Sequence, residues 1–373
     1  VTHVSGLPRH DALWYCRSYD RASLFSRLRH LEPSTSFRGR YQYQNLMFMT
    51  AGYLVEALTD EPWDARIDQR IFTPLGMTRS NTSVRDLHPD DDVALPYYLD
   101  GDSLVRVPYR NIDAIGPAGS INSSVEEMLA YVQMHLDSGL AGDVRILSAD
   151  QIAMMQTAQS AVGSRDRYPE LGPATYGLAL RLGTYRGHKM AGHGGGIDGF
   201  ISSMIWLPNE RIGVVVLTNR SGDANPVPTI VQQRVLDELL GLDPIDWNAR
   251  IRAEWEEGRA REAEARAKRE AERVPGTAPS HALADYAGTY DHPGYGRVEV
   301  VAHDGALRIR WDGDEVPLAH YHYDVFEVSH AGPNTPLEGR LQFLMGMDGT
   351  VDRLVVPLEP AVDPIVFRRV PAP

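Results

Sequence analysis

The stretch AGHGGGIDGF, residues 191–200, places five glycines, one histidine and one aspartate in ten positions. Residues 194–199 fit the pattern G-x-G-x-x-G, which in dinucleotide-binding proteins opens a helix, because the helix N-terminus receives the phosphate. Here the run is followed by FISSMIWLP, residues 200–208, which is apolar and β-prone and contains a proline at its end. A strand in this place excludes the phosphate-binding interpretation.

The tetrapeptide HGGG, residues 193–196, also resembles the oxyanion loop of lipases. Such enzymes carry their nucleophile in a Gly-x-Ser-x-Gly motif, and the sequence contains none. Two interpretations of the glycine run remain. It is either a purely structural strand edge or a place where a ligand lies against backbone amides.

The segments around this stretch predict an antiparallel sheet covered by a helix. β-prone segments alternate with short turns over residues 176–183, 184–191, 200–208 and 211–219. Short connections of this kind join antiparallel strands. A helix predicted over residues 228–240 should pack on the sheet through one apolar stripe, made of Val231, Val235, Leu236 and Leu239.

Three more helices are predicted nearer the N-terminus. NLMFMTAGYLVEAL, residues 45–58, is apolar on nearly every face, which predicts a helix buried all round. Ser123 with Glu126 forms a capping-box pattern before a helix that reaches about Leu136, and Ser148 with Gln151 repeats the pattern.

The composition changes after residue 246. Charges alternate up to residue 273, which predicts a solvated helix, and the segment PGTAP, residues 275–279, ends it. From residue 281 onward short β-like segments alternate with turns, which predicts a small antiparallel barrel or sandwich. A hairpin around residues 290–295 is expected to close it.

Composition excludes several kinds of partner. The 373 residues carry a net charge of −13 and show no basic patch, so nucleic acid and anionic membranes are unsuitable partners. No apolar run is long enough to span a bilayer. The single cysteine, Cys16, excludes internal disulfides and Cys-rich metal sites, and we expect neither metal nor cofactor. His320 and His322 lack an evident third ligand, so a half-buried aromatic strand is favoured there over a zinc pair.

Several phrases together resemble the serine hydrolases related to class C β-lactamases, a family that includes D-Ala-D-Ala carboxypeptidases, D-aminopeptidases and esterases. The phrases lie in order over about residues 1–240: THVSGLP at 2–8, YQYQNLMFMTAGYLVE at 41–56, IFTPLGM at 71–77, GPAGSINSSVEEM at 116–128 and the glycine run. Beyond residue 281, YAGTYDHPGYG and HYHYDVFEV look like the small lipocalin-like β domain that follows many such hydrolases.

This resemblance implies an α/β (α+β) fold of the β-lactamase/transpeptidase type, with an antiparallel sheet flanked by helices and a helical subdomain. It implies a hydrolase domain over residues 1–245, a charged helical linker over 246–280 and a small barrel-like β domain over 281–373.

The resemblance also implies site residues. Tyr43 and Asn45 match a Tyr-x-Asn motif, in which the tyrosine acts as general base and the asparagine positions substrate. Residues 193–195 match the third motif of the family, which places His193 and Gly195 against the substrate and the amide of Gly196 in the oxyanion hole. Asp198 is expected to stabilise a turn rather than to meet a substrate amine.

The first family motif, Ser-x-x-Lys, which supplies the nucleophile, is absent. No serine is followed three places later by lysine, and the only lysines are Lys189 and Lys268. In the family this motif precedes the phrase at residues 2–8, so we expect it upstream of residue 1, along with a possible export signal. We also expect this chain alone to be inactive.

The substrate implied by the resemblance is a small amide, lactam, ester or D-amino-acid peptide. The alternative is a non-catalytic binding protein that retains the cleft.

Overall fold

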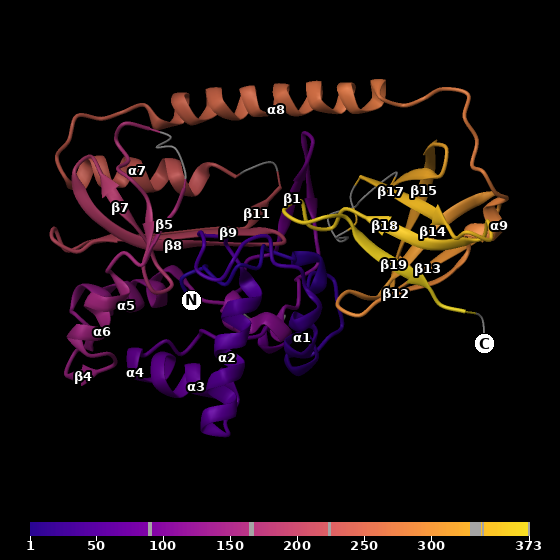
Figure 1. Ribbon diagram of the computed structural model, residues 1–373. Coiled ribbons are helices and arrows are strands. Elements are labelled where there is room, and N and C mark those ends of the chain that lie inside the picture. The colour runs from indigo at the N-terminus through magenta and orange to yellow at the C-terminus, as the bar shows by residue number, and fades with distance from the viewer. Residues whose placement is uncertain (89–91, 164–167, 223–224, 329–336, 338, 372–373) are drawn as a thin grey trace. The chain divides into compact units, whose positions relative to one another are not determined.

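The computed structural model describes residues 1–88, 92–163, 168–222, 225–328, 337 and 339–371 (Figure 1). The chain forms two compact units, and each is described by itself. Unit 1 contains residues 1–5, 37–41 and 47–260, and unit 2 contains residues 6–36, 42–46 and 261–373. The domain boundaries expected from the sequence, at residues 245 and 280, stay predictions, because a compact unit is a group of residues in mutual contact and not a domain assignment.

Unit 1 is built on a six-stranded antiparallel sheet with the strand order β10-β9-β8-β7-β6-β5. The strands are β5 (Ser160–Ala161), β6 (Thr175–Tyr176), β7 (Arg181–Tyr185), β8 (His188–Ile197), β9 (Phe200–Leu207) and β10 (Ile212–Thr218). The predicted antiparallel sheet is therefore confirmed, and the glycine run lies inside its longest strand.

One of the predicted strands has the wrong bounds. Residues 184–191, predicted as one strand, contain the turn between β7 and β8, where Arg186 and Gly187 have φ angles of 48° and 89°. Positive φ at both central residues is the geometry of a type I′ hairpin turn, whose twist matches that of the flanking strands. The alternation of apolar residues did not reveal this turn.

Strand β9 shows how the sheet is covered on both faces. Ile205 and Leu207 belong to a core that includes Leu236 of α7 (Val227–Leu239), whereas Trp206 belongs to a core that includes Val132 of α5 (Val125–Leu136). Successive side chains of a strand point to opposite faces, so α7 and α5 lie on opposite sides of the sheet, as Figure 1 shows.

The buried face of α7 differs from the predicted stripe. Val231 and Leu239 are exposed, while Gln232, Gln233 and Asp237 are buried beside Leu236. The polar residues are tolerated against the sheet because several have partners there. Gln232 accepts a hydrogen bond from the Ser203 hydroxyl at 3.0 Å, and Asp237 accepts one from the Tyr185 hydroxyl at 2.6 Å.

Helix α2 (Asn45–Thr59) forms where it was predicted, but the prediction that it is buried all round was wrong. Leu46 and Met49 are fully buried, whereas Leu54 is 56% exposed and Leu58 is 76% exposed. A Cβ added at Gly52 would lie 2.1 Å from the ring of Pro117, so this face of the helix packs closely against Pro117. The opposite apolar face packs against little of the described chain.

The caps of two predicted helices can be compared with the sequence. Helix α6 (Ala149–Met155) has the predicted capping box, formed by Ser148 and Gln151. Helix α5 is capped one residue later than predicted, because the Ser124 side chain accepts from the backbone of Glu127 at 3.3 Å. Ser123 instead shares a hydrogen bond with the Ser80 hydroxyl.

The remaining elements of unit 1 are short. They include α3 (Trp63–Ile67), α4 (Thr73–Leu75), a small sheet of order β11-β1-β2, and the hairpin of β3 (Leu140–Ala141) and β4 (Val144–Arg145). The small sheet consists of β1 (Tyr97–Asp100), β2 (Ser103–Arg106) and β11 (Arg220–Ser221).

The predicted charged helix is α8 (Trp247–Ala271), whose residues divide between the two units after Ala260. Only Trp247 and Ile251 in its first turns are buried, so the rest of the helix is solvated as predicted.

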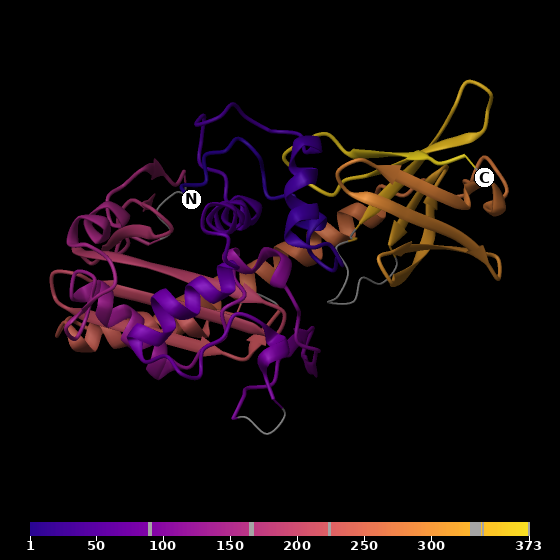
Figure 2. The same cartoon turned by 90° about the horizontal axis from the view of Figure 1, so that it is seen from below.

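Unit 2 contains a closed antiparallel barrel of eight strands, in the order β12 to β19 (Figure 2). The strands are β12 (Gly288–His292), β13 (Gly296–His303), β14 (Ala306–Trp311), β15 (Asp314–His322), β16 (Val325–Val328), β17 (Arg340–Met345), β18 (Val351–Val356) and β19 (Ile365–Arg369). The predicted barrel is confirmed, and its ring closes through the pairing of β12 with β19. Residues 314–328 form two strands, β15 and β16, with Tyr323 at positive φ between them.

The N-terminal segment of unit 2 carries η1 (Asp11–Leu13), α1 (Arg21–Arg27) and η2 (Leu28–His30), and the short α9 (Leu283–Tyr286) precedes the barrel. His10 fastens the segment to the barrel, because it is fully buried and its Nδ1 lies 2.7 Å from the Tyr295 hydroxyl. Its backbone N–H donates to the carboxylate of Glu359 at 2.9 Å. The segment is thus an integral part of unit 2.

Candidate functional site

The glycine-rich end of β8 is a strand edge with one free side. The pairing of β7 with β8 ends at Gly192, whereas β9 pairs with β8 as far as Ile197. Residues 194–196 are exposed. In the part of the chain that the structure describes, their backbone therefore has a strand partner on one side only, which is the arrangement needed to receive a ligand.

Gly195 cannot be replaced without disturbing its neighbour in β9. A Cβ at this position would lie 2.6 Å from the hydroxyl of Ser202, which faces it in the strand register. The absence of a side chain therefore keeps the edge flat.

His193 precedes the three glycines and is held by hydrogen bonds at both ring nitrogens. Its Nδ1 lies 2.6 Å from the carbonyl oxygen of Gly194, and its Nε2 lies 3.0 Å from the hydroxyl of Tyr176. The same hydroxyl lies 3.2 Å from Nε2 of His3. His3, Tyr176 and His193, which we call the His–Tyr–His chain, thus connect the N-terminal phrase of the sequence to the glycine run.

The direction of each hydrogen bond follows from the carbonyl at one end. A carbonyl only accepts, so Nδ1 of His193 carries the proton and donates to Gly194. Burial lowers the pKa of His193, so the ring is neutral near pH 7 and its Nε2 accepts from Tyr176. The Tyr176 oxygen then accepts from Nε2–H of His3. In this arrangement the hydrogen bonds run in one direction, from His3 through Tyr176 and His193 to the Gly194 carbonyl.

Two of the three members of the His–Tyr–His chain, His3 and Tyr176, are deeply buried. His3 is 2% exposed and Tyr176 is fully buried, and the His3 ring packs against Tyr41, Phe48 and Tyr176 at centroid distances of 5.5, 5.0 and 4.7 Å. A buried polar network with satisfied hydrogen bonds is rigid, so the imidazole of His193 and the Gly194 carbonyl have a fixed orientation.

The turn after β8 is fixed by an ion pair. Arg110 donates to Asp198 at 2.7 Å, and both side chains are largely buried. Gly199 has φ of 82°, and its N–H donates to the Ser221 hydroxyl at 2.7 Å. Asp198 thus supports the turn through Arg110, and its charge is already balanced.

Tyr43 and Asn45 lie at the start of α2 and belong to unit 2. The Tyr43 ring lies 5.2 Å from the Arg9 guanidinium carbon, and the Asn45 amide donates to Asp11 at 3.5 Å. Between them, the Gln44 amide donates to the Pro8 carbonyl at 2.5 Å. His193, Gly195 and Gly196 belong to unit 1, so the structure describes the two halves of the predicted site separately, and their catalytic roles stay predictions.

Sequence reasoning missed His3, Tyr176 and Arg110. His3 stands in the phrase THVSGLP and Tyr176 in YGLAL, and both are single polar or aromatic residues without a spacing signal. Only the fold brings His3 and Tyr176 to His193, and Arg110 to Asp198.

Among the described residues, no group of three His, Cys, Asp or Glu side chains is arranged to hold a metal ion. Nε2 of His320 donates to the Tyr323 carbonyl, 2.8 Å away, and His320 does not pair with His322. No helix in the described ranges is long and apolar enough to cross a membrane.

Comparison with known proteins identifies both parts of the chain. Residues 1–236 match the family described as Beta-lactamase, and residues 272–369 match a domain of unknown function, DUF3471. Among solved structures, the octameric penicillin-binding protein homologue from Pyrococcus abyssi is similar with a TM-score of 0.57 at 21% identity, over 98% of this chain and 76% of that one. The predicted β-lactamase/transpeptidase-like fold with a C-terminal barrel is thereby confirmed.

Two curated relatives are similar in sequence. Unguisins hydrolase ungD' of Aspergillus campestris is 29% identical over 81% of this chain and 57% of its own length. A D-aminopeptidase of Cereibacter sphaeroides is 29% identical over 62% of this chain and 42% of its own length. The chain therefore spans little more than half of the first relative. Because the family match extends over residues 1–236, the chain belongs to the β-lactamase family of serine hydrolases.

Proposed function

We propose that the polypeptide containing this chain is a serine amidohydrolase that acts through an acyl-enzyme on small peptides or amides, with D-amino-acid substrates as the preferred class. The observation that carries the proposal is the exposed glycine edge of β8 beside an orientated imidazole. Similarity to a D-aminopeptidase and to an unguisins hydrolase supports the choice of an amide over an ester.

The glycine edge would bind the substrate through its main chain. A carbonyl that becomes an oxyanion needs N–H donors about 3 Å away, and only a strand without side chains lets it approach so closely. The amide of Gly196 is one such donor in this proposal. Gly194 and Gly195 would hold the peptide group next to the reacting one.

The His–Tyr–His chain would keep this edge in register. Glycine has the largest conformational freedom of all residues, and three glycines in sequence leave the strand loosely defined. The hydrogen bond from His193 to the Gly194 carbonyl fixes the peptide plane between Gly194 and Gly195. His193 is therefore proposed as a positioning residue of the edge, in addition to its predicted contact with substrate.

Tyr43 is the proposed general base for a nucleophilic serine of a Ser-x-x-Lys motif, which residues 1–373 do not contain. The first experiment is to read the coding DNA in frame upstream of Val1. A Ser-x-x-Lys motif a few tens of codons upstream would support the proposal, and a stop codon next to Val1 would exclude it. In the second case the chain would be a binding protein that retains the strand edge.

The activity test follows on the longer polypeptide. D-phenylalanine amide should be hydrolysed faster than L-phenylalanine amide, and Tyr43→Phe should reduce kcat by about 10²–10⁴-fold, as expected for loss of a general base. Tyr109→Phe, which removes only a hydrogen bond to the Ala94 carbonyl, is the matched control. Equal activity of Tyr43→Phe and Tyr109→Phe would refute the assigned role.

A further inference from the structure

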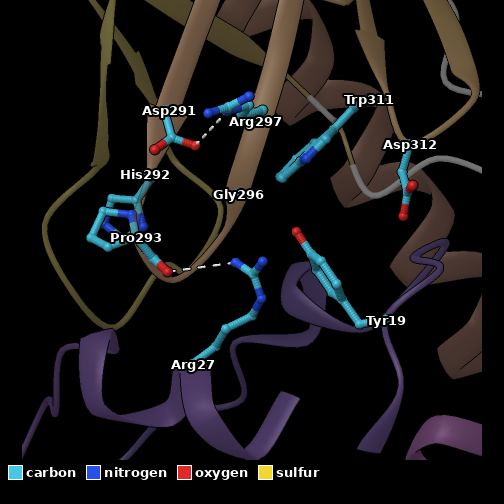
Figure 3. A pocket seen from close by; sticks show the side chains of 9 residues that line it. All are labelled: Tyr19, Arg27, Asp291, His292, Pro293, Gly296, Arg297, Trp311 and Asp312. Atoms are coloured by element: carbon cyan, nitrogen blue, oxygen red, sulfur yellow. Dashed lines mark hydrogen bonds and ion pairs between the residues drawn. The ribbon is translucent and has the colours of Figure 1, made fainter. Parts of the chain in front are cut away.

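Unit 2 contains a cavity of about 410 Å³ that the hydrolase family does not explain. Tyr19 and Arg27 line it from the N-terminal segment, and Trp311, the β12–β13 hairpin and Asp312 line it from the barrel (Figure 3). Its size falls within the range of about 300–1,000 Å³ that is typical of small-molecule sites. All of its lining residues belong to unit 2, so the cavity is complete within one compact body.

Two aromatic rings and a glycine shape the cavity. Gly296 has φ of 79°, and a Cβ there would lie 2.1 Å from the Tyr19 hydroxyl, so Tyr19 fits only because position 296 has no side chain. The Trp311 ring is buried, and the Arg17 guanidinium carbon lies 3.2 Å from its centroid. Tyr19 and Trp311 therefore form two fixed aromatic walls of a cavity whose other lining residues are mostly polar.

The carboxylates at the cavity are already balanced. Asp312 accepts from the backbone N–H and the hydroxyl of Ser18 at 2.5 and 2.6 Å. The buried Arg17 next to it supplies a compensating charge, although burial lowers the pKa of Arg17 to about 10. Asp291 forms an ion pair with Arg297 at 3.6 Å.

Arg27 is the cation at this cavity that takes part in none of these charge pairs. Its Nη1 donates to the carbonyl oxygens of Gly294 and Pro293 at 2.8 and 3.5 Å, and its guanidinium lies over the Tyr19 ring at 4.0 Å. Within the described ranges no carboxylate pairs with it. Figure 3 shows its side chain reaching into the cavity between Pro293 and Tyr19.

His292 adds no charge to the cavity. Its Nδ1 accepts from the backbone N–H groups of Gly294 and Tyr295, both at 3.1 Å, so the proton of the neutral ring is on Nε2. Burial lowers the pKa of His292, which keeps the ring neutral near pH 7. The cavity thus combines the positive charge of Arg27, which no carboxylate pairs with among the described residues, with the two aromatic rings of Tyr19 and Trp311.

We propose that this cavity binds a small monocarboxylate that carries an aromatic or flat apolar group. Arg27 would pair with the carboxylate through its remaining N–H donors, since a guanidinium and a carboxylate match in a planar, two-bonded geometry. The apolar group would lie against Tyr19 and Trp311. A dianion such as inorganic phosphate fits less well, because a single unmatched cation balances a single charge. The site is formed jointly by the DUF3471 part of the chain, which contributes Trp311, and by Tyr19 and Arg27 of the N-terminal segment. Its ligand-binding role is independent of the hydrolase proposal.

Calorimetric titration of the 373-residue chain with phenylacetate tests the proposal, with phenylacetamide as a probe of the same shape without charge. Phenylacetate should bind about tenfold more tightly than phenylacetamide, because only the carboxylate forms charge-assisted hydrogen bonds with the guanidinium. Equal binding of the two probes, or no binding of either, would overturn the proposal.

Two arginines of the same region provide the matched variants. Arg27→Met keeps the aliphatic stem and removes the charge, so it should weaken phenylacetate binding about tenfold. Arg29→Met, at an exposed position two residues later, should leave it unchanged. If Arg27→Met lowers the Tm, Arg27→Gln is measured instead at a temperature where it is folded. Unchanged affinity in a folded Arg27 variant contradicts the proposal.

The carboxylate could come from a free acid or from the C-terminus of a peptide. Titration with the tripeptide Gly-Gly-Phe distinguishes the two sources. Binding of both probes with loss in Arg27→Met would identify a peptide end, and binding of phenylacetate alone would identify a free acid.

Discussion

At the scale of single residues, the most informative contact is the hydroxyl of Tyr176 between two imidazoles. A donor to the neutral form of a histidine lowers its pKa, so the Tyr176 hydroxyl acts in the same direction as burial on His193. The role of this hydroxyl can be separated from the role of burial by removing one oxygen atom.

Tyr176→Phe should raise the pKa of His193 toward its ordinary value and leave Nε2 without a donor. NMR titration of ¹⁵N-labelled imidazoles measures both the pKa and the tautomer of His193. Tyr109→Phe removes a hydroxyl that donates to the Ala94 carbonyl and not to the His–Tyr–His chain, so it should leave both unchanged. A lower or unaltered His193 pKa in Tyr176→Phe would mean that the hydroxyl does not donate to this ring.

His135 is a second histidine whose charge state matters, and its role is stability. It is 3% exposed, stacks on Trp206 at 4.5 Å, and neither ring nitrogen has a hydrogen-bond partner among the described residues. Burial lowers its pKa from 6.5 to about 4. The folded state therefore disfavours the proton, and stability that is complete above pH 6.5 is lost as the pH falls toward 4.

Because the pKa of His135 in the folded state is near 4, lowering the pH from 7 to 5 should reduce the free energy of unfolding by about 2 kcal/mol through this residue. His135→Phe keeps the stacking ring and cannot titrate. Between pH 7 and pH 5 the free energy of unfolding of this variant should therefore fall by about 2 kcal/mol less than that of the unsubstituted protein. Urea denaturation of both proteins at the two pH values gives the difference directly. Identical pH dependence would show that His135 remains neutral or solvated in both states.

At the scale of elements, α7 is fastened to the sheet by a buried carboxylate. Asp237 is 1% exposed and accepts hydrogen bonds from Tyr185, Arg186 and the Trp247 indole at 2.6, 2.8 and 3.1 Å. Three elements, β7 with its turn, α7 and the start of α8, therefore meet at one side chain.

Asp237→Ala should lower the free energy of unfolding by about 3 kcal/mol, because it leaves Arg186 and two buried donors without their acceptor. Glu238→Ala, at the next position of the same helix, removes only an exposed pair with Arg234 and should change it by less than about 0.5 kcal/mol. Denaturant unfolding measures the free energy of unfolding of both variants. Equal losses in Asp237→Ala and Glu238→Ala would refute the role of Asp237.

The same helix shows what the sequence could and could not predict. Its position and the antiparallel sheet followed from apolar spacing, but its buried face did not, because Gln232, Gln233 and Asp237 look like surface residues until their partners are known. The apolar pattern also did not reveal the turn at Arg186 and Gly187. Apolar patterns record burial, whereas the polar contacts that position His193 depend on residues far apart in the chain.

At the scale of the whole molecule, the two compact units predict unfolding in more than one step. Calorimetry should show two transitions. Phe367→Ala, which empties a fully buried position in the barrel, should lower the free energy of unfolding of unit 2 by about 3–5 kcal/mol. It should therefore lower the Tm of the unit 2 transition alone. Asp237→Ala should lower the Tm of the unit 1 transition alone. A single transition displaced by both variants would show that the units unfold together.

The closure of the barrel between β12 and β19 has a consequence for protein synthesis. The first strand of the ring leaves the ribosome long before the last one, and until β19 arrives β12 presents unpaired backbone groups on one side. The nascent ring can therefore complete itself only after its final strand is made, and during that interval it is exposed to pairing with other growing chains. Translation speed and chaperone supply should therefore influence the yield of this part of the protein more strongly than its final stability does.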